Sequence, residues 1–350
     1  MTQRGTQGGT QGPIYEPEHE PVRLLLVYTH PDLPSTRVRV LQLAPHLAER
    51  GFVVECRAYP GSMGDKRELW RRRDEWDLVL LQDKLLSVSE ALFWRALALP
   101  LIFDFDDALP YRHKPKRGSH RSRTRERRFR RTLDVATGIA AGNRFLAGLA
   151  EAAAKPVHIT PSAVPFPVSE HTARPQLDRF RVGWVGSRGN LDSLRTIGPA
   201  LQELARELPL ELVVIADAGL ELDGVEVVHR PWSLAGQEAE IARLDVGVMP
   251  LEDNEWNRGK CAYKLLQYMA AGVPSVASAV GMNADLIADG ENGLLASDVG
   301  DWARALRRLH GDSGLRGRLG RAGRETVASG YTYPVVAEGF GAFARGLVQA

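Results

Sequence analysis

The chain contains 350 residues, of which 44% are hydrophobic and 25% are charged, and its formal net charge is +2. This length exceeds what one hydrophobic core usually organises, so we expect a globular protein of two domains. The two cysteines, Cys56 and Cys261, lie far apart and without metal-type spacing, which argues against a disulfide framework or a zinc site and favours a reducing cytoplasm. No apolar run reaches the roughly 20 residues that span a bilayer.

The N-terminal half alternates predicted strands and helices. Continuous apolar runs predict strands that are buried on both faces, at 22–30, 52–59, 76–82 and 100–108. One helix is predicted to begin at Ser35 or Thr36 and to stop at Gly51, and a second covers 89–99. Because the crossovers are too long for hairpins, this rhythm favours an open parallel α/β sheet.

The same alternation restarts after a Pro-rich segment at 161–179. The second half has predicted strands at 180–187, 210–216, 245–251 and 274–278, and predicted helices at 191–208, 237–244 and 260–272. We therefore predict a disordered tail (1–20), an N-terminal domain (21–165), a linker (166–180), a C-terminal domain (181–330) and a last helix (331–350) that packs back on the N-terminal domain. A cleft between the two domains is the expected ligand site.

Positive charge is concentrated between Arg112 and Arg131. This stretch carries eleven Lys and Arg residues and one acid, Glu126. Such a density of positive charge favours an anionic membrane surface as a partner. We therefore expect the protein to bind peripherally to the inner face of the membrane. The aromatic residues of this stretch are limited to Tyr111 and Phe129, so we expect no nucleic acid. A solvated helix without any partner is the alternative.

The predicted helix at 260–272 has two different faces. At 100° per residue, Lys260, Lys264 and Gln267 fall within about 60° of one another, opposite an apolar face. Gly259 precedes them and lets the backbone approach a ligand, while the free N–H groups of a helix N-terminus favour an anion. The pattern predicts a phosphate site, and an amphipathic helix with its lysines in water is an equally good interpretation of the geometry alone.

Residues 245–296 resemble the nucleotide-sugar-binding segment of the retaining group 1, or family 4, GT-B glycosyltransferases. The matching elements occur in order: the strand ending at Pro250, the following helix, and the motifs AAGVP, SAVGMNADLI and DGENGLL. Looser similarity covers GWVGS, FDFDDA, AGNRFLAGLA and the late LRGRLGRAGRETVASGYTY. The resemblance implies an α/β protein with two Rossmann-like parallel-sheet domains facing a cleft.

The resemblance also implies a reaction. The protein would move a sugar from a nucleoside diphosphate sugar to the hydroxyl of a glycan or lipid-linked acceptor, with retention, in glycan or glycolipid synthesis. The C-terminal domain would bind this donor and the N-terminal domain the acceptor, without a tightly bound cofactor or metal. Lys260, Lys264 and Arg188 would then stabilise the departing diphosphate.

Two positions depart from the family pattern. The family's pair of glutamates would fall at Gly259 and Gln267, and neither residue is acidic here. Gln267 can still hydrogen-bond a diol, more weakly than a carboxylate. We interpret this as divergence within an active branch, and the alternative is a non-catalytic nucleotide-sugar-binding protein.

Other donor-side candidates follow the strands of the second half. Gly186, Ser187 and Arg188 form a Gly-rich strand-to-helix turn that can hold phosphate through backbone N–H groups, although such turns are often simple connections. By resemblance, Trp232 borders the nucleotide base and Asn283 lies with the donor.

Acceptor-side candidates follow the strands of the first half. His30, Ser35, Arg37 and Arg39 lie where the first strand gives way to a helix, a junction that by resemblance faces the cleft; both arginines could equally face solvent.

Asp106 and Asp107 close another strand of the first half, where either could orient an acceptor hydroxyl. Capping the next helix or pairing with the arginine cluster is the alternative. Asp104 and Asp106 form a D-x-D pattern, but we expect no metal because they are far from the predicted donor site.

Overall fold

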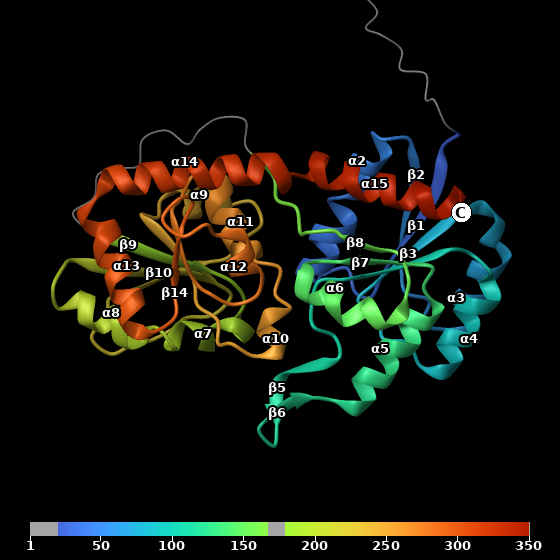
Figure 1. Cartoon of the computed structure of the whole chain (residues 1–350), viewed down its shortest axis with the longest axis horizontal. Helices are drawn as coiled ribbons and strands as arrows, with labels where there is room; N and C mark the ends of the chain where they lie inside the picture. Colours follow the sequence, from blue (N-terminus) through green and yellow to red (C-terminus); the bar gives the residue numbers. More distant parts are fainter. Residues whose placement is uncertain (1–19, 167–178, 350) are drawn as a thin grey trace, which may run out of the picture.

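The computed structural model describes residues 20–166 and 179–349 as two α/β domains joined side by side (Figure 1). The predicted tail lies outside the described residues except for Glu20, and so does most of the predicted linker. Both domains have a parallel sheet between layers of helices, which confirms the predicted fold class. None of the described helices combines the length and apolar character that crossing a bilayer requires.

The N-terminal sheet has six parallel strands in the order β2-β1-β3-β4-β7-β8. The strands are β1 (Val22–Tyr28), β2 (Phe52–Ala58), β3 (Leu78–Gln82), β4 (Leu101–Phe105), β7 (Gly138–Ala141) and β8 (Val157–Ile159). Every residue of β3, β4 and β7 is buried, as their continuous apolar sequences require. The helices of this domain are α1 (Pro34–Thr36), α2 (Ala44–Ala48), α3 (Met63–Arg71), α4 (Val88–Leu97), α5 (Arg123–Val135) and α6 (Arg144–Ala150).

The C-terminal sheet has the order β11-β10-β9-β12-β13-β14, again all parallel. Its strands are β9 (Phe180–Val185), β10 (Leu210–Ala216), β11 (Val227–Pro231), β12 (Val246–Met249), β13 (Ser275–Ser278) and β14 (Leu294–Ala296). This is the Rossmann order, in which the connections reverse between β9 and β12 and leave a crevice outside the carboxyl ends of these strands. The helices are α7 (Asp192–Arg195), α8 (Gly198–Ala205), α9 (Gln237–Ala242), α10 (Glu255–Arg258), α11 (Tyr263–Ala270), α12 (Met282–Leu286), α13 (Val299–Gly311), α14 (Ser313–Gly330) and α15 (Tyr333–Gln349).

The last helix, α15, leaves the C-terminal domain and packs on the N-terminal domain beside α2 (Figure 1). Tyr333 and Phe340 share a buried apolar cluster with Leu24 of β1 and Leu47 of α2. The hydroxyl of Tyr333 also donates to Oε1 of Gln42 at 2.7 Å. The chain therefore crosses between the domains twice, and α15 buries residues that would otherwise expose one face of the N-terminal sheet.

The helix predicted to run from Ser35 or Thr36 to Gly51 is not continuous. It is divided into α1, a π-helical turn (Arg37–Leu41) and α2. Neither predicted cap is used, because α1 begins at Pro34 after Leu33. Pro45 has no N–H group to donate to the preceding turn, which ends the first helical segment there.

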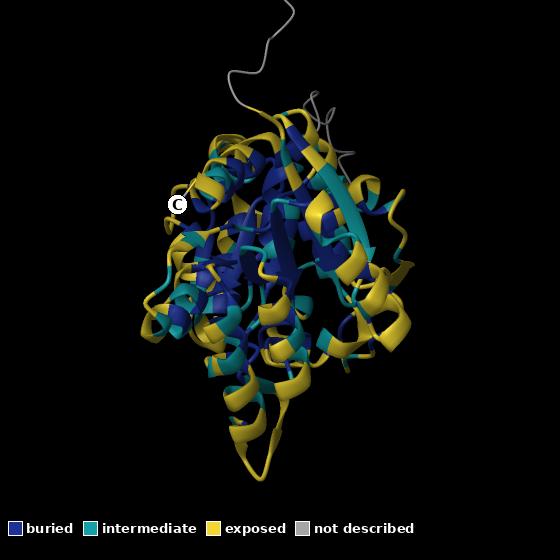
Figure 2. Cartoon of the chain, turned by 90° about the vertical axis from the view of Figure 1, so that its right-hand side faces the viewer, coloured by how far each residue is buried: buried dark blue, intermediate teal, exposed yellow. Residues whose placement is uncertain are grey.

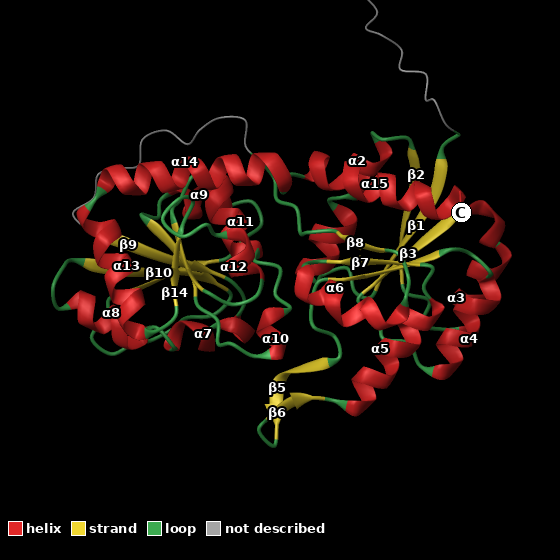
Figure 3. Cartoon of the chain, viewed as in Figure 1, coloured by secondary structure: helices red, strands yellow, loops and turns green. Residues whose placement is uncertain are grey.

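The basic segment between Arg112 and Arg131 contains more than a helix. A two-stranded antiparallel hairpin, β5 (Tyr111–Lys116) and β6 (Ser119–Arg121), precedes α5. Its turn uses Arg117 and Gly118 at φ +53° and +72°, the left-handed pair typical of tight hairpins. Residues 113–119 are exposed, and the hairpin projects from the body of the molecule (Figures 2 and 3).

Candidate functional site

The two domains meet through the loops at the carboxyl ends of their sheets. Nζ of Lys260 lies 2.8 Å from Oδ1 of Asp107, which follows β4 of the other domain. The amide of Asn143, at the start of α6, donates to the carbonyl of Lys260 at 3.1 Å. Sγ of Cys261 lies 3.3 Å from the carbonyl of Asp106. The segment that carries Lys260 is therefore held by the N-terminal domain.

The backbone of Gly259 lies close to the N-terminal domain. A Cβ atom added there would lie 2.6 Å from Cβ and 2.7 Å from the backbone nitrogen of Ala108, so no side chain fits. Lys260, Cys261 and Ala262 do not belong to the helix that was predicted at 260–272, because α11 begins at Tyr263 after Ala262, which has φ +49°. The turn between α10 and α11 places Lys260 against Asp107, and this contact cannot be derived from helical periodicity.

Lys264 lies inside the C-terminal domain, beside the Gly-rich turn. Its Nζ is 5.1 Å from the ring centroid of Trp184 on β9, and a Cβ at Gly186 would lie 3.0 Å from its Cε. Within the described residues, Lys264 forms no ion pair. Burial, together with the charge of Lys260, lowers the pKa of Lys264 to about 8. Burial alone would lower the pKa of Lys260 as well, but Asp107 outweighs this effect and raises it.

The Gly-rich turn itself is open to solvent. Ser187 and Arg188 are exposed, and the backbone N–H of Arg188 donates to Oδ1 of Asp217 at 2.6 Å. The turn opens at the carboxyl end of β9, at the reversal point of the Rossmann sheet. Gly186 and Lys264, which are far apart in the sequence, thus lie together and place a cation beside the turn.

A polar network lies on the face of α11 that carries Lys264 and Gln267. Nε1 of Trp232 donates to Oε1 of Gln237 at 3.1 Å, and Nε2 of Gln267 donates to the same oxygen at 2.9 Å. The guanidinium of Arg37, from the N-terminal domain, lies 5.3 Å from the Trp232 ring. Three predicted site residues therefore come together, although Gln237 was not predicted. Its place at the start of the predicted helix 237–244, close to Trp232 in sequence, is the signal that could have found it.

The acceptor-side carboxyl groups cluster at the ends of two neighbouring strands. Asp106 follows β4, and Asp83, which sequence reasoning missed, follows β3. Each has a buried Oδ1 with no hydrogen-bond partner in the described part of the chain. Burial raises the pKa of Asp106 to about 6, with Arg39 opposing and Asp107 and Asp104 adding to the shift. Burial and the neighbouring Asp106 also raise the pKa of Asp83. The aspartate directly after the LVLLQ strand was the available signal for Asp83.

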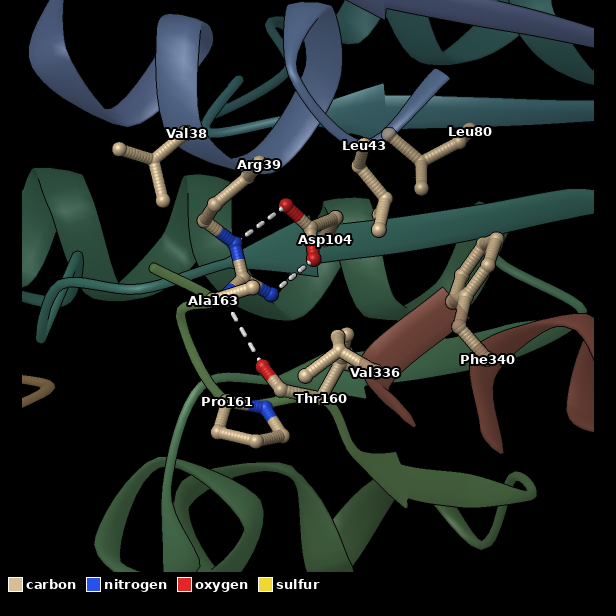
Figure 4. Close-up of a pocket in the computed structure, with 10 residues that line it drawn as sticks. All are labelled: Val38, Arg39, Leu43, Leu80, Asp104, Thr160, Pro161, Ala163, Val336 and Phe340. Atoms are coloured by element: carbon tan, nitrogen blue, oxygen red, sulfur yellow. Dashed lines mark hydrogen bonds and ion pairs between the residues drawn. The ribbon is translucent and has the colours of Figure 1, made fainter. Parts of the chain in front are cut away.

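Arg39 is placed differently from the prediction. Its side chain is buried, and its Nε donates to Oδ2 of Asp104 at 2.9 Å while its Nη1 donates to the carbonyl of Thr160 at 2.9 Å (Figure 4). The adjacent cavity is only about 10 Å³, enough for one water molecule at most. Arg39 therefore neutralises a buried carboxylate inside the domain instead of facing an acceptor or solvent.

The remaining predicted residues are spread more widely. Asn283 is 1% exposed, and its amide donates to the carbonyls of Met249 and Ser278 at 3.5 and 3.2 Å, so it connects the ends of β12 and β13. Its buried Oδ1 has no hydrogen-bond partner among the described residues. Ser35 is half-buried, and His30 is exposed with Nδ1 3.6 Å from Asp32.

The two carboxylates of the D-x-D pattern have different surroundings. The first carboxylate, Asp104, is engaged by Arg39. Across the described ranges, no group of three or more His, Cys, Asp or Glu side chains is placed to hold a metal ion.

Part of the C-terminal domain matches a family of known proteins. Residues 179–312 match the family described as "Glycosyl transferases group 1". Over 137 residues the chain is 34% identical to D-inositol 3-phosphate glycosyltransferase of Arthrobacter sp. (strain FB24), a match that covers 39% of this chain and 30% of that relative's length.

Solved structures match nearly the whole chain. Sucrose-phosphate synthase from Thermosynechococcus elongatus has a TM-score of 0.71 at 16% identity, with 94% of this chain and 99% of that chain covered. HepE of Anabaena, solved in complex with UDP and glucose, has a TM-score of 0.68 at 16% identity, covering 94% and 100% of the two chains. At this identity the likeness concerns the fold. The chain thus has the GT-B fold, and its residues 179–312 match the group 1 glycosyltransferase family.

Proposed function

We propose that this protein is a glycosyltransferase that moves a sugar from a nucleoside diphosphate sugar to an acceptor hydroxyl. The observation that carries the proposal is the place of Lys264, whose charge has no carboxylate partner in the described chain and lies against Gly186 at the end of β9. An unpaired ammonium in a half-buried crevice is costly unless an anion binds there. A diphosphate supplies that anion.

The diphosphate would be stabilised from two sides during transfer. Lys264, beside Gly186, would meet one side, and Lys260 would exchange Asp107 for a phosphate oxygen. As the bond between the anomeric carbon and the diphosphate oxygen breaks, negative charge grows on the leaving group. Preorganised cations in a cleft between two domains stabilise that charge more in the transition state than in the ground state.

The acceptor would enter from the N-terminal domain. Asp106 and Asp107 lie at the carboxyl end of β4, and an ionised carboxylate there can accept the proton of an acceptor hydroxyl as its oxygen attacks the anomeric carbon. Attack on the face that the leaving group vacates gives retention of configuration. We extend the proposal to retention and to a glycan or lipid-linked acceptor, as the resemblance of residues 245–296 implies.

The exposed hairpin and α5 support the proposal that the protein binds peripherally to an anionic membrane. Five of the eleven Lys and Arg residues lie on the hairpin, which projects from the molecule (Figure 2), and six lie on α5. Each Lys or Arg near an anionic bilayer contributes about 1 kcal/mol. Such a surface would bring the cleft close to lipid-linked acceptors on the cytoplasmic side.

A non-catalytic nucleotide-sugar-binding protein is the second candidate. It is favoured by Gly259, where no side chain can reach a donor sugar, and by the ion pair that occupies Lys260.

One experiment separates the two functions. Thermal-shift screening against UDP-, GDP- and ADP-sugars identifies the donor, because a bound ligand raises the melting temperature by mass action. Incubation of that donor with acceptor sugars and lipids, followed by NMR of the anomeric proton of the product, then tests transfer and retention. Binding without release of nucleotide in the presence of any acceptor would favour the binding protein. No stabilisation by any of the donors would contradict both candidates.

A further inference from the structure

The hydrogen-bond directions around Gln237 are determined by Trp232. An indole N–H can only donate a hydrogen bond. Because Nε1 of Trp232 lies 3.1 Å from Gln237, the atom that Gln237 presents there must be its oxygen. The reversed amide would set two donors against each other. Gln237 is 7% exposed, so water cannot easily replace a lost bond.

The orientation of the Gln237 amide also determines that of the Gln267 amide. The same oxygen of Gln237 lies 2.9 Å from the Gln267 amide, so Gln267 must present its Nε2 donor to it. Oε1 of Gln267 then accepts no hydrogen bond from the described residues and remains available to a ligand. Lys264 and Gln267 are three residues apart on α11, which places them on one face of the helix.

We infer that Gln237 is a positioning residue that, under the control of Trp232, holds the Gln267 amide with its oxygen toward the hydroxyl groups of the bound nucleotide sugar. This inference rests on the proposed function, because it places a nucleotide sugar in the cleft. The ligand groups concerned are hydroxyls, which donate to an amide oxygen without a charge.

The inference explains why residue 267 is a glutamine here. A glutamate would present two acceptors and no donor, so its carboxylate would face the oxygen of Gln237. Gln237 could relieve this repulsion only by turning its amide, which would leave the N–H of Trp232 against an NH2 group. Trp232 therefore determines the orientation of the Gln237 amide, and Gln237 in turn determines the orientation of the Gln267 amide.

A double-mutant cycle in the ligand-free protein tests this dependence. The four proteins are the parent, Gln267→Glu, Trp232→Phe and the double variant, compared by their midpoints of thermal unfolding. Gln267→Glu should lower the midpoint by about 2–4 °C. In the Trp232→Phe background the same change should lower it little, because Gln237 is then free to turn and donate to the carboxylate. Additive shifts, or an unchanged midpoint in Gln267→Glu, would overturn the inference.

Gln202 provides the matched control. Its Nε2 also donates a single hydrogen bond, to the carbonyl of Asp223 at 2.9 Å, but it lies outside the network. Gln202→Glu removes the same kind of bond, and its effect should be equal in the parent and in Trp232→Phe. A coupling of the same size as that of Gln267→Glu would show that the cycle reports a general effect of the tryptophan and not the orientation of Gln237.

Two variants of Gln237 give an independent readout. Gln237→Glu keeps acceptor oxygens for both partners, whereas Gln237→Leu removes them. In protein labelled with 15N at tryptophan, the indole N–H resonance that disappears in Trp232→Phe should move upfield in Gln237→Leu and stay close to its place in Gln237→Glu. Equal shifts in both variants would contradict the inference.

Nucleotide titrations then test whether the network of Trp232, Gln237 and Gln267 affects ligand binding. Titration with UDP, GDP and ADP should show that Gln237→Leu weakens binding of the preferred nucleotide about tenfold and that Gln237→Glu keeps it within about twofold. With a donor in hand, the loss should fall on KM more than on kcat. If no nucleotide binds the parent protein, the proposed function fails while the thermal cycle still decides the network. If nucleotide binds and both variants bind equally, the inference fails and the proposed function stands.

Discussion

Lys260 of the C-terminal domain and Asp107 of the N-terminal domain form an ion pair across the cleft, with Nζ 2.8 Å from Oδ1. The pair joins the residue expected at the leaving diphosphate to one expected at the acceptor. Both side chains are partly exposed, at 24% and 34%, so the attraction is moderate and a phosphate can compete for Lys260. In the ligand-free protein this ion pair therefore holds the two halves of the site together. We expect a phosphate of the bound donor to replace Asp107 as the partner of Lys260.

Asp107→Asn should strengthen nucleotide binding and weaken catalysis. The change releases Lys260 and removes a negative charge that repels phosphate, so the affinity for the preferred nucleoside diphosphate should rise about two- to fivefold. Isothermal titration with UDP, GDP and ADP measures this. Asp134→Asn is the control, since Asp134 lies in the last turn of α5, before the amino end of β7, whereas Asp107 follows the carboxyl end of β4. Weaker binding in Asp107→Asn would contradict an exchange of partners.

Lys264→Met should reduce turnover without reducing stability. Loss of a cation at the leaving group lowers kcat by about a hundredfold. The pKa of about 8 for Lys264 lies below that of a lysine in an unfolded chain, so below pH 8 the buried charge opposes folding. That penalty disappears as the pH rises from about 8 to 10.5.

Methionine removes this penalty, and the melting temperature at pH 7 should therefore stay equal or rise. Calorimetry beside a transfer assay checks both parts. Lys155 precedes β8 at the far edge of the N-terminal sheet. Lys155→Met is therefore the control and should leave turnover unchanged. A loss of turnover that simply followed a fall in melting temperature would assign Lys264 a structural role.

The pH dependence of kcat/KM should be bell-shaped. Asp106, with a pKa of about 6, must be ionised to accept a proton, and Lys264, with a pKa of about 8, must be charged to bind the diphosphate. Activity should therefore fall below about pH 6 and above about pH 8. Lys264→Arg should move the alkaline limb upward, because a guanidinium stays charged.

Asp106 should also affect stability, with a sign that can be worked out. Its pKa in the folded protein is raised above the ordinary value of 3.8, so the folded state binds more protons than the unfolded state between about pH 4 and 6. Stability should fall as the pH rises through this interval. Asp106→Asn should flatten that slope in unfolding experiments, and an unchanged slope would show that Asp106 titrates normally.

Gly259→Glu, which places a carboxylate where the family pattern has one, should inactivate the protein. A side chain at this position meets the backbone of Ala108 and would separate the domains, so transfer should fall at least tenfold and the radius of gyration in small-angle scattering should increase. Gly346→Ala on α15 is the control, because a Cβ there meets nothing within 4 Å. Gain of activity in Gly259→Glu would contradict the observed contact.

Reversing the charge of the hairpin should abolish attraction to anionic membranes. Lys114→Glu together with Lys116→Glu changes the charge of an exposed element by four units, and binding to vesicles of phosphatidylserine and phosphatidylcholine should fall at least tenfold. Co-sedimentation measures the bound fraction. Arg308→Glu with Arg321→Glu, exposed residues of the other domain, makes the same change in net charge. Equal losses in the two pairs would indicate a nonspecific effect of charge.

Much of the fold could be predicted because parallel strands buried on both faces are continuous apolar runs. The strands at 22–30, 76–82, 100–108, 210–216 and 245–251 were predicted within a few residues of their observed ends. Three predicted helices differ from the structure. The helix predicted at 191–208 is divided into α7 and α8. Pro45 interrupts the helix predicted to stop at Gly51, and the contacts of residues 259 and 260 with Ala108 and Asn143 hold residues 260–262 out of the helix predicted at 260–272.

The sequence by itself determined that two parallel α/β domains meet and that cations gather near Lys260, since both follow from residue type and order along the chain. Only the tertiary structure decided which of these charges is free. Arg39 is neutralised by Asp104 and Lys260 is paired with Asp107, whereas Lys264 keeps its charge beside Gly186. The physical reason is that ionic partners are chosen by distance in space, and each of these partners comes from a segment remote in the sequence.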